Sequence, residues 1–266
     1  MTTMIVNDLF NPSATLRSDP YPVYHRLRAT GAVQPTPEGD GWLATSHAAV
    51  QAVLREPGWS SDHRQATAHK RWLESQGAPE AADELLSKVL LFMDPPDHSR
   101  VRGLISKAFT PRTVERLRPR IHALVDELLA PARETGALDV ITDLAYPLPV
   151  TVICELLGVP AGDREFFREQ TRKLAVILAW EITAEQFTEA AGAAVAFAAY
   201  LLPLFVDRKR DPRDDLISAL VAAEEAGDQL EADELLTTVV LLLTAGHETT
   251  MNLIGNGMLA LLRNRD

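Results

Sequence analysis

The chain has 266 residues, of which 46% are hydrophobic and 24% are charged, a composition typical of a globular protein. Its net charge of −11 argues against a general nucleic-acid binder, because such a protein needs a basic surface. The single cysteine, Cys154, excludes a disulfide framework and any zinc site built from paired cysteines. Residues 1–16 show no basic segment leading into an apolar one, so we expect no signal peptide and a cytoplasmic protein.

Residues 1–60 are expected to mix helix and strand. A helix opens at residues 19–22 and ends before Gly31. The short run at 41–45 lies between turn residues and predicts a strand. Ser46 is placed to cap the helix that follows.

Residues 59–92 lack a clean period and predict a long loop with a short helix at 81–90. Beyond this loop the pattern becomes helical. Asp97 follows two prolines and is placed to cap the next helix. Thr110, which precedes Pro111, is placed to cap the one after it.

The remainder predicts helix after helix. Pro, Gly or Asp separates helices at 117–134, 150–157, 163–178, 184–208 and 214–226. The last helix covers about residues 230–262 and would be roughly 50 Å long at 1.5 Å per residue. Its apolar stretch Val239–Leu243 is short, whereas a spanning helix needs about 20 apolar residues, so we expect no membrane span.

Residues 243–250, Leu-Thr-Ala-Gly-His-Glu-Thr-Thr, are unusual for the middle of a long helix. Gly246 costs about 1 kcal/mol relative to alanine there, and it leaves room where something flat can approach. Thr249 shares a face with Ala245 and can hydrogen-bond back to the preceding turn. With the carboxylate of Glu248, this pattern predicts a proton-delivery site. The alternative is a polar interruption at a helix crossing, with Glu248 reaching solvent.

A second candidate site lies in the helix after Pro95 and Pro96. His98 and Arg102 are four residues apart, so their side chains point the same way. Together they offer donors to an anionic group, and the helix N-terminus adds its positive end. The alternative is a capping turn with solvated side chains.

Charge is unevenly distributed along the chain. Between His98 and Arg120 the basic residues are Arg100, Arg102, Lys107, Arg112, Arg116, Arg118 and Arg120, and the only acid is Glu115. That segment carries +6, so the rest carries −11 − 6 = −17. The basic residues either solvate their helices or bind an anionic ligand or an acidic partner protein.

Three stretches resemble the bacterial, soluble class of the cytochrome P-450 family, the haem-thiolate monooxygenases. Residues 94–102, Asp-Pro-Pro-Asp-His-Ser-Arg-Val-Arg, resemble the beginning of the family's C helix, which residues 107–111 continue. Residues 156–160, Leu-Leu-Gly-Val-Pro, resemble the end of its E helix, and residues 245–250 resemble its I-helix signature. Fold and domain expectations follow: a mainly α protein with a small β part, forming a single domain over residues 1–266, with a mixed α/β portion (1–60) and a helical portion (95–266).

The resemblance implies haem b as the cofactor. His98 and Arg102 would bind a haem propionate. Ala245 and Gly246 would let the long helix lie over the haem face where oxygen binds.

The resemblance also implies insertion of one oxygen atom of O2 into a hydrophobic organic substrate, in bacterial secondary metabolism, with Glu248 and Thr249 delivering protons. Electrons would come from NAD(P)H through a ferredoxin or flavodoxin, which would dock near the basic segment 98–120. The loop between Trp59 and Phe92, and the segment around Trp180 and Phe187, would line the substrate pocket.

In this family a cysteine near the C-terminus ligates the iron, and a Glu-x-x-Arg pair supports it. Both features lie beyond the I helix, and neither follows Thr250 here. Cys154 lies in an apolar helix, where we expect a buried, inert thiol. We therefore expect no metal ligand within residues 1–266 and interpret the chain as a cytochrome P-450 domain that is incomplete at its C-terminus.

Two alternatives remain. The first is a non-catalytic cytochrome P-450-like protein that activates or binds another enzyme. The intact Glu248–Thr249 pair, together with His98 and Arg102, disfavours it, because a scaffold does not need these residues. The second is an unrelated all-α interaction module.

Overall fold

The computed structural model describes residues 19–36, 39, 41–66, 80–176, 183–225 and 227–265. Backbone contacts divide the chain into two units, Met1–Asp83 and Glu84–Asp266. The described residues are mostly helical, with two two-stranded sheets, which confirms the expected mainly α fold with a small β part. That the two units form one domain stays a prediction.

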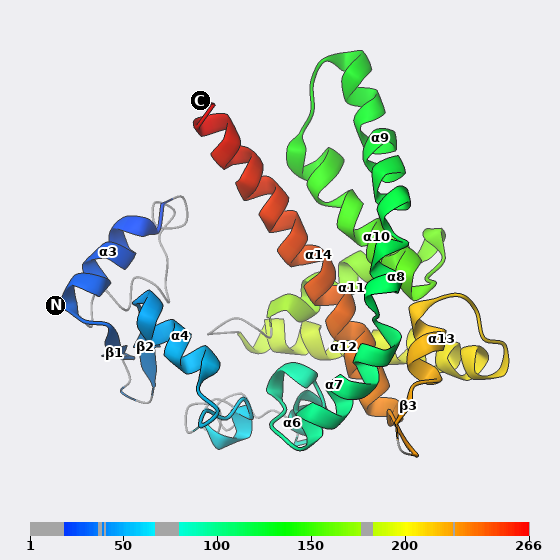
Figure 1. Cartoon of the computed structure of the whole chain (residues 1–266), viewed down its shortest axis with the longest axis horizontal. Coiled ribbons are helices and arrows are strands. Elements are labelled where there is room, and N and C mark those ends of the chain that lie inside the picture. Colours follow the sequence, from blue (N-terminus) through cyan, green and yellow to red (C-terminus); the bar gives the residue numbers. More distant parts are fainter. Residues whose placement is uncertain are drawn as a thin grey trace. The chain divides into compact units, whose positions relative to one another are not determined.

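The first unit contains a short antiparallel hairpin between two helices (Figure 1). Its elements are α3 (Tyr21–Thr30), β1 (Val33–Pro35), β2 (Trp42–Ala44), α4 (His47–Arg55) and the 3-10 turn η1 (His63–Gln65). Ser46 caps α4 as expected, since its hydroxyl accepts from the Ala49 N–H at 3.2 Å. Strand β1 was not predicted, because Gln34 and Pro35 do not give it an apolar pattern. The buried Gln34 amide instead donates to the Leu27 carbonyl.

The second unit is a set of helices. They are α6 (Glu80–Ser87, which begins in the first unit), η2 (Leu90–Phe92), α7 (Asp97–Ala108), α8 (Pro111–Glu115), α9 (Arg118–Thr135), the π-helix η3 (Val140–Ala145), α10 (Pro147–Leu157), η4 (Ala161–Asp163), α11 (Arg164–Ala175), α12 (Ala184–Arg210), α13 (Leu216–Val221) and α14 (Ala232–Arg263). A two-residue pair of strands, β3 (Glu224–Glu225) and β4 (Asp228–Gln229), precedes α14.

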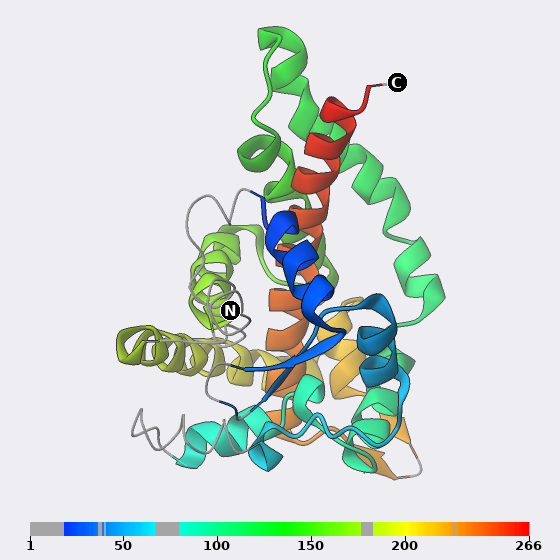
Figure 2. The ribbon, with the colours of Figure 1, turned by 90° about the vertical axis from the view of Figure 1, so that its left-hand side faces the viewer.

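Helix α14 is the axis of this unit, and α10, α11 and α12 pack against it. In Figures 1 and 2, α12 crosses the N-terminal half of α14. The core forms where α14 places Val239 and Leu243 beside Leu157 of α10 and Phe197 and Leu201 of α12, all fully buried or nearly so. Because burial of one large apolar side chain contributes about 1.5–3 kcal/mol, this junction holds the helices together.

Two local predictions were wrong. Asp97 does not cap α7, because the helical bonding starts one turn earlier: the His98 N–H donates to the Asp94 carbonyl at 3.0 Å. The expected helix over 214–226 ends at Val221, and the β3–β4 turn follows it. Gly227 lies in that turn with φ 85°, a conformation that glycine adopts without strain.

Two helical stretches, Val140–Leu157 and Ala184–Arg210, are long and apolar enough to cross a membrane by length and composition alone. The expectation of no membrane span considered Val239–Leu243 and did not include these two stretches. Core helices of water-soluble proteins pass the same test, so the observation is weak evidence for a membrane span. In each stretch, 28% of the apolar 18-residue window is buried within the structure.

A buried polar contact joins three helices at Gly158. This residue ends α10 with φ 76°, and its carbonyl accepts from the Arg208 guanidinium of α12 at 3.2 Å. The same guanidinium donates to Asp215 at 2.6 Å, and Asp215 caps α13 by accepting from the Ser218 N–H at 2.8 Å. Arg208 and Asp215 are 2% and 5% exposed, so each needs the other as a partner.

We expect Gly158→Ala to destabilise the protein strongly. A Cβ at this position would lie 2.2 Å from an Asp215 carboxylate oxygen, and the left-handed backbone adds its own penalty. Displacing Asp215 leaves Arg208 buried without its partner, so we expect a loss of about 3 kcal/mol or more in urea unfolding. Gly162→Ala is the matched control, because nothing lies within 4 Å of its Cβ position. Equal effects of the two substitutions would contradict this account.

Candidate functional site

The middle of α14 opens to the surface on one face. The Thr249 hydroxyl donates to the Ala245 carbonyl at 2.6 Å, which confirms the predicted bond to the preceding turn. Both residues are exposed, and Leu253, one turn further on, is 72% exposed. Ala245, Thr249 and Leu253 therefore form one accessible face, called here the open face of α14.

Glu248 and His247 lie on other sides of the same turn. Glu248 is half-buried, and within the described part of the chain its carboxylate has no hydrogen bond or ion pair. His247 is only 5% exposed, and its Nδ1 lies 2.8 Å from the Leu243 carbonyl oxygen. The structure therefore leaves Glu248 available for proton exchange, while His247 belongs to the core.

Gly246 faces helix α10. A Cβ added there would lie 3.4 Å from the Ile153 side chain, so the glycine lets α14 pack closely on α10. Of the two small residues, Ala245 lies on the open face and Gly246 lies at the helix crossing. The cofactor role predicted for Gly246 stays a prediction, and the structure gives this residue a packing role as well.

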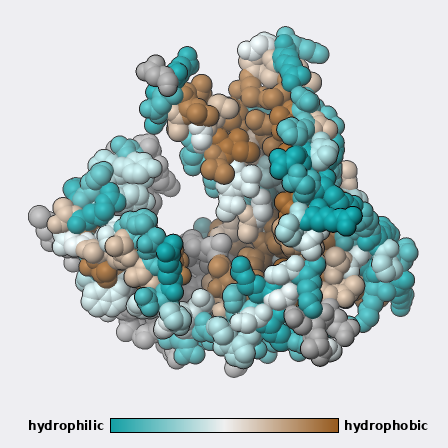
Figure 3. Space-filling view, viewed as in Figure 1, coloured by the Kyte–Doolittle hydropathy of each residue, from teal (hydrophilic) through white to brown (hydrophobic). Residues whose placement is uncertain are grey.

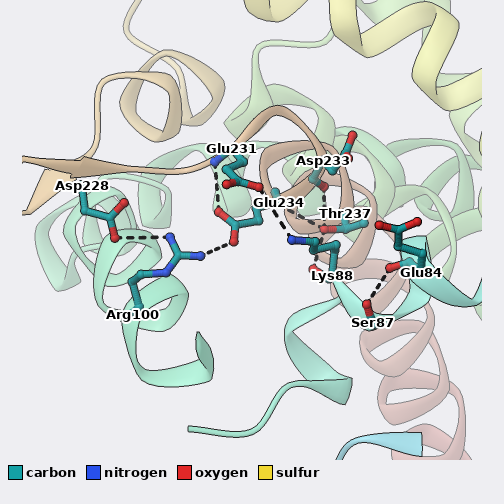
Figure 4. Close-up of polar contacts among 9 residues, drawn as sticks. All are labelled: Glu84, Ser87, Lys88, Arg100, Asp228, Glu231, Asp233, Glu234 and Thr237. Atoms are coloured by element: carbon teal, nitrogen blue, oxygen red, sulfur yellow. Dashed lines mark hydrogen bonds and ion pairs between the residues drawn. The ribbon is translucent and has the colours of Figure 1, made fainter. Parts of the chain in front are cut away.

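His98 and Arg102 lie one turn apart on α7, as predicted. Among the described residues neither side chain has a hydrogen bond or ion pair; His98 is half-buried and Arg102 is exposed. Arg100, two residues from each, points to the other side of the helix and binds Glu234 and Asp228 (Figure 4). Near the N-terminus of α7, His98 and Arg102 thus offer nitrogen donors that no other described residue uses, and Arg100 between them is held in place by its ion pairs.

The ion pair of Arg100 and Glu234 fixes α7 to the beginning of α14. Glu234 is 2% exposed, and it also accepts from the Glu231 N–H at 3.0 Å. Its carboxylate raises the pKa of the Arg100 guanidinium through a hydrogen bond, so the guanidinium stays charged. Figure 4 shows that α14 is also linked to the segment between α6 and η2: the Thr237 hydroxyl donates to the Lys88 carbonyl at 2.8 Å. The helix-capping spacing of Glu231 and Glu234 is the one sequence pattern that could have indicated this cluster.

The basic segment 98–120 is largely neutralised, by its own Glu115 and by acids elsewhere in the chain. Its ion pairs are Arg100 with Asp228 and Glu234, Arg116 with Asp214, Arg118 with Glu115, and Arg120 with Glu127 and Glu155. Within the described ranges, Arg102 and Arg112 have no acidic partner. The local sum of +6 therefore overstates the positive charge that this surface presents.

Cys154 is 1% exposed, and burial raises the pKa of its thiol to about 11. This confirms the expectation of a buried cysteine. No group of three or more His, Cys, Asp or Glu residues in the described ranges is arranged to hold a metal ion. Of the segments expected to line a substrate pocket, residues 67–79 of the loop between Trp59 and Phe92 lie outside the described residues, and so does Trp180.

We expect Cys154 to react slowly with a thiol reagent in the native chain. The thiol is enclosed and protonated at neutral pH, and only the thiolate is nucleophilic. In denaturing urea the same residue should react at the rate of a free cysteine, which serves as the internal control. Stoichiometric labelling of the folded chain at the free-cysteine rate would show that this region of α10 is open.

Comparisons with known proteins agree with the motifs. Residues 71–266 match the sequence profile of the cytochrome P-450 family. The chain is 41% identical over 255 residues to the cytochrome P-450 monooxygenase PikC of Streptomyces venezuelae, covering 94% of this chain and 58% of that protein. It is 38% identical over 263 residues to the vitamin D(3) 25-hydroxylase of Pseudonocardia autotrophica, covering 98% of this chain and 61% of that protein.

Solved structures give the same result. The ligand-free structure of Mycobacterium smegmatis CYP164A2 matches with a TM-score of 0.81 at 43% identity, over 98% of this chain and 64% of that one. The complex of P450BioI with a hexadec-9Z-enoic acid-ligated acyl carrier protein matches with a TM-score of 0.84 at 33% identity, over 95% of this chain and 63% of that one. The chain spans about 60% of the length of these curated relatives. With its motifs, its helices and its profile in agreement, the chain belongs to the cytochrome P-450 family.

Proposed function

We propose that this chain forms the oxygen-side part of a haem-dependent monooxygenase that inserts one oxygen atom of O2 into a hydrophobic organic substrate. The observation that carries the proposal is the open face of α14, where the Thr249 hydroxyl is held by the Ala245 carbonyl. A small residue, an alcohol and an adjacent carboxylate that no other described residue pairs with together suit proton delivery beside a flat apolar group.

The residues present fit haem b. The α14 open face offers Ala245 and Leu253 as apolar contacts for a planar ring, and both are exposed. His98 and Arg102 offer donors for a propionate, and within the described part of the chain neither is engaged by another residue. When bound, haem supplies the iron at which O2 is activated.

Thr249 and Glu248 have separate tasks in this proposal. Because the Thr249 hydroxyl donates to the Ala245 carbonyl, its oxygen is free to accept a hydrogen bond from a group bound over the open face. Glu248, which has no ion pair among the described residues, can take a proton from solvent and pass it toward Thr249. Positioned acids of this kind typically contribute about 10²–10⁴-fold to rate.

The iron ligand is proposed to come from a segment outside these 266 residues. Cys154 is enclosed in the core, and its neutral thiol does not face the open face of α14. Apolar side chains gather over the C-terminal half of α14 (Figure 3), where Leu259, Leu261 and Leu262 are exposed. A proximal segment would cover them.

The substrate class and the electron donor are also part of the proposal. One relative is named a vitamin D(3) 25-hydroxylase, and another is named a cytochrome P-450 monooxygenase, PikC, so we propose a hydrophobic substrate from secondary metabolism. We further propose electrons from NAD(P)H, delivered in the cytoplasm by a ferredoxin or flavodoxin. Arg112, exposed and without an acidic partner among the described residues, is the proposed contact for such an acidic protein.

The complete protein carrying this sequence should bind haem b and give the carbon monoxide difference spectrum after which the family is named. Arg102→Ala should lower haem retention during gel filtration, because it removes a donor to the propionate. Arg112→Ala is the control, since this arginine is also unpaired but lies outside the first turns of α7. A complete protein that fails to bind haem would favour the non-catalytic alternative.

Thr249→Ala should uncouple electron consumption from product formation in the complete enzyme. Reductant would still be consumed, but a larger share would appear as hydrogen peroxide, because the hydroxyl that receives protons is gone. Thr250→Ala is the matched control: its hydroxyl makes the same type of bond, to the Gly246 carbonyl at 3.1 Å, from a half-buried position off the open face. An unchanged ratio of product to peroxide in Thr249→Ala would refute its role.

A further inference from the structure

Helix α12 is apolar on two opposite sides. Its inner side packs on α11 and α14 through Ala190, Ala193, Phe197, Leu201 and Phe205, all buried. Its outer side carries a second apolar row, called here the outer stripe, which consists of Thr188, Gly192, Val195, Ala199, Leu202 and Val206, all exposed. Helices on a protein surface normally have a polar outer side.

The three large apolar side chains of the outer stripe are well exposed to solvent. Val195 is 69% exposed, Val206 is 53% exposed and Leu202 is 39% exposed. Contiguous exposed apolar surface of this kind marks an interaction site rather than a solvated surface.

Spacing within the outer stripe identifies the geometry of the partner. Successive members are separated by 4, 3, 4, 3 and 4 residues, which is the repeat of a coiled-coil seam. The series reads the same in both directions. A helix with this seam therefore matches a second copy of itself that runs antiparallel, with the twofold axis near residue 197.

The charges at the two ends of α12 complete the match. Glu185 and Glu189 lie in the first turns, and Lys209 and Arg210 lie in the last turn; all four are exposed. Within the described part of the chain none of them has an ion pair. In an antiparallel pair the acidic end of one helix meets the basic end of the other.

We propose that two copies of this protein associate through an antiparallel pairing of their α12 helices. Positions whose numbers add to 394 then face each other: Val195 opposes the partner's Ala199, Gly192 opposes the partner's Leu202, and Thr188 opposes the partner's Val206. At the ends, Glu185 opposes the partner's Lys209. The small residues Gly192 and Ala199 accept the larger Leu202 and Val195, so each layer joins a small side chain to a large one.

A membrane surface fits the outer stripe less well. Helices that lie on membranes carry Lys and Arg along their polar side, which attract anionic lipids. Here the flanking charge is acidic at one end and basic at the other, so a lipid surface that attracts one end repels the other. The opposite charges favour a second copy.

Charge reversal tests the pairing. In sedimentation equilibrium of the purified protein, Glu185→Lys should raise the dimer dissociation constant by about tenfold, because each substitution occurs twice in a twofold dimer. The double variant Glu185→Lys with Lys209→Glu should restore association to within about threefold of the unsubstituted protein, since opposite charges meet again. Failure of the double variant to restore association overturns the antiparallel arrangement.

Substitution in the centre of the outer stripe tests the surface itself. Leu202→Glu should weaken association by at least about 100-fold, because it places two carboxylates in the apolar seam. Val114→Glu on α8 is the control, since Val114 is exposed to a similar extent, 44%, but lies outside α12. Circular dichroism melts verify that both variants fold. A protein that is monomeric without substitution, or that binds anionic vesicles through Leu202, contradicts the proposal.

Disulfide cross-linking tests whether the two α12 helices run antiparallel. Thr188→Cys with Val206→Cys should form a disulfide-linked dimer on mild oxidation, because these positions face each other between copies. Thr188→Cys alone should not, since the two cysteines of an antiparallel dimer would lie about 27 Å apart along the helix, at 1.5 Å per residue. Efficient cross-linking of the single variant would instead show a parallel arrangement and overturn this one.

Discussion

One part of helix α14 is packed in the core and another part is accessible at the surface, and the arrangement of the second unit depends on this difference. Its 32 residues extend for about 48 Å, and its buried residues all lie in the N-terminal half. Buried residues are concentrated between Glu234 and Leu243, and His247 is the last of them. Ala245, Glu248 and Thr249 therefore stand at the boundary, where a helix that is fixed in the core first becomes accessible.

A site at such a boundary is held in place without being enclosed. Packing on α10 and α11 fixes the position of α14, and the Arg100–Glu234 pair fixes α7 against its first turn. Because a buried carboxylate without a partner is costly, the pair leaves little freedom for α7 to shift. His98 and Arg102 are thereby positioned by a neighbouring residue that does not belong to the candidate site.

Several predictions whose cause was local were confirmed, although the cap expected at Asp97 did not form. The caps at Ser46 and Thr110 depend on a hydroxyl and an N–H three residues later, and both formed. The hydrogen bond from Thr249 to Ala245 likewise depends only on helical spacing. Long-range partners could not be predicted in this way, because Asp228 and Glu155 reach the basic segment only through the fold. For the same reason the sum of +6 did not describe the folded surface.

The glycines show why a motif alone does not assign a role to each of its residues. Gly246 belongs to the same signature as Ala245, yet one side of α14 faces Ile153 and the other is open. Gly158 also belongs to a recognisable motif, residues 156–160, and the need for glycine at this position comes from Asp215, which is 57 positions further along the chain. In each case the missing side chain makes room for another helix of the same chain. A small residue in a family motif therefore indicates close approach, and only the face on which it lies shows whether the neighbour is a cofactor or the protein itself.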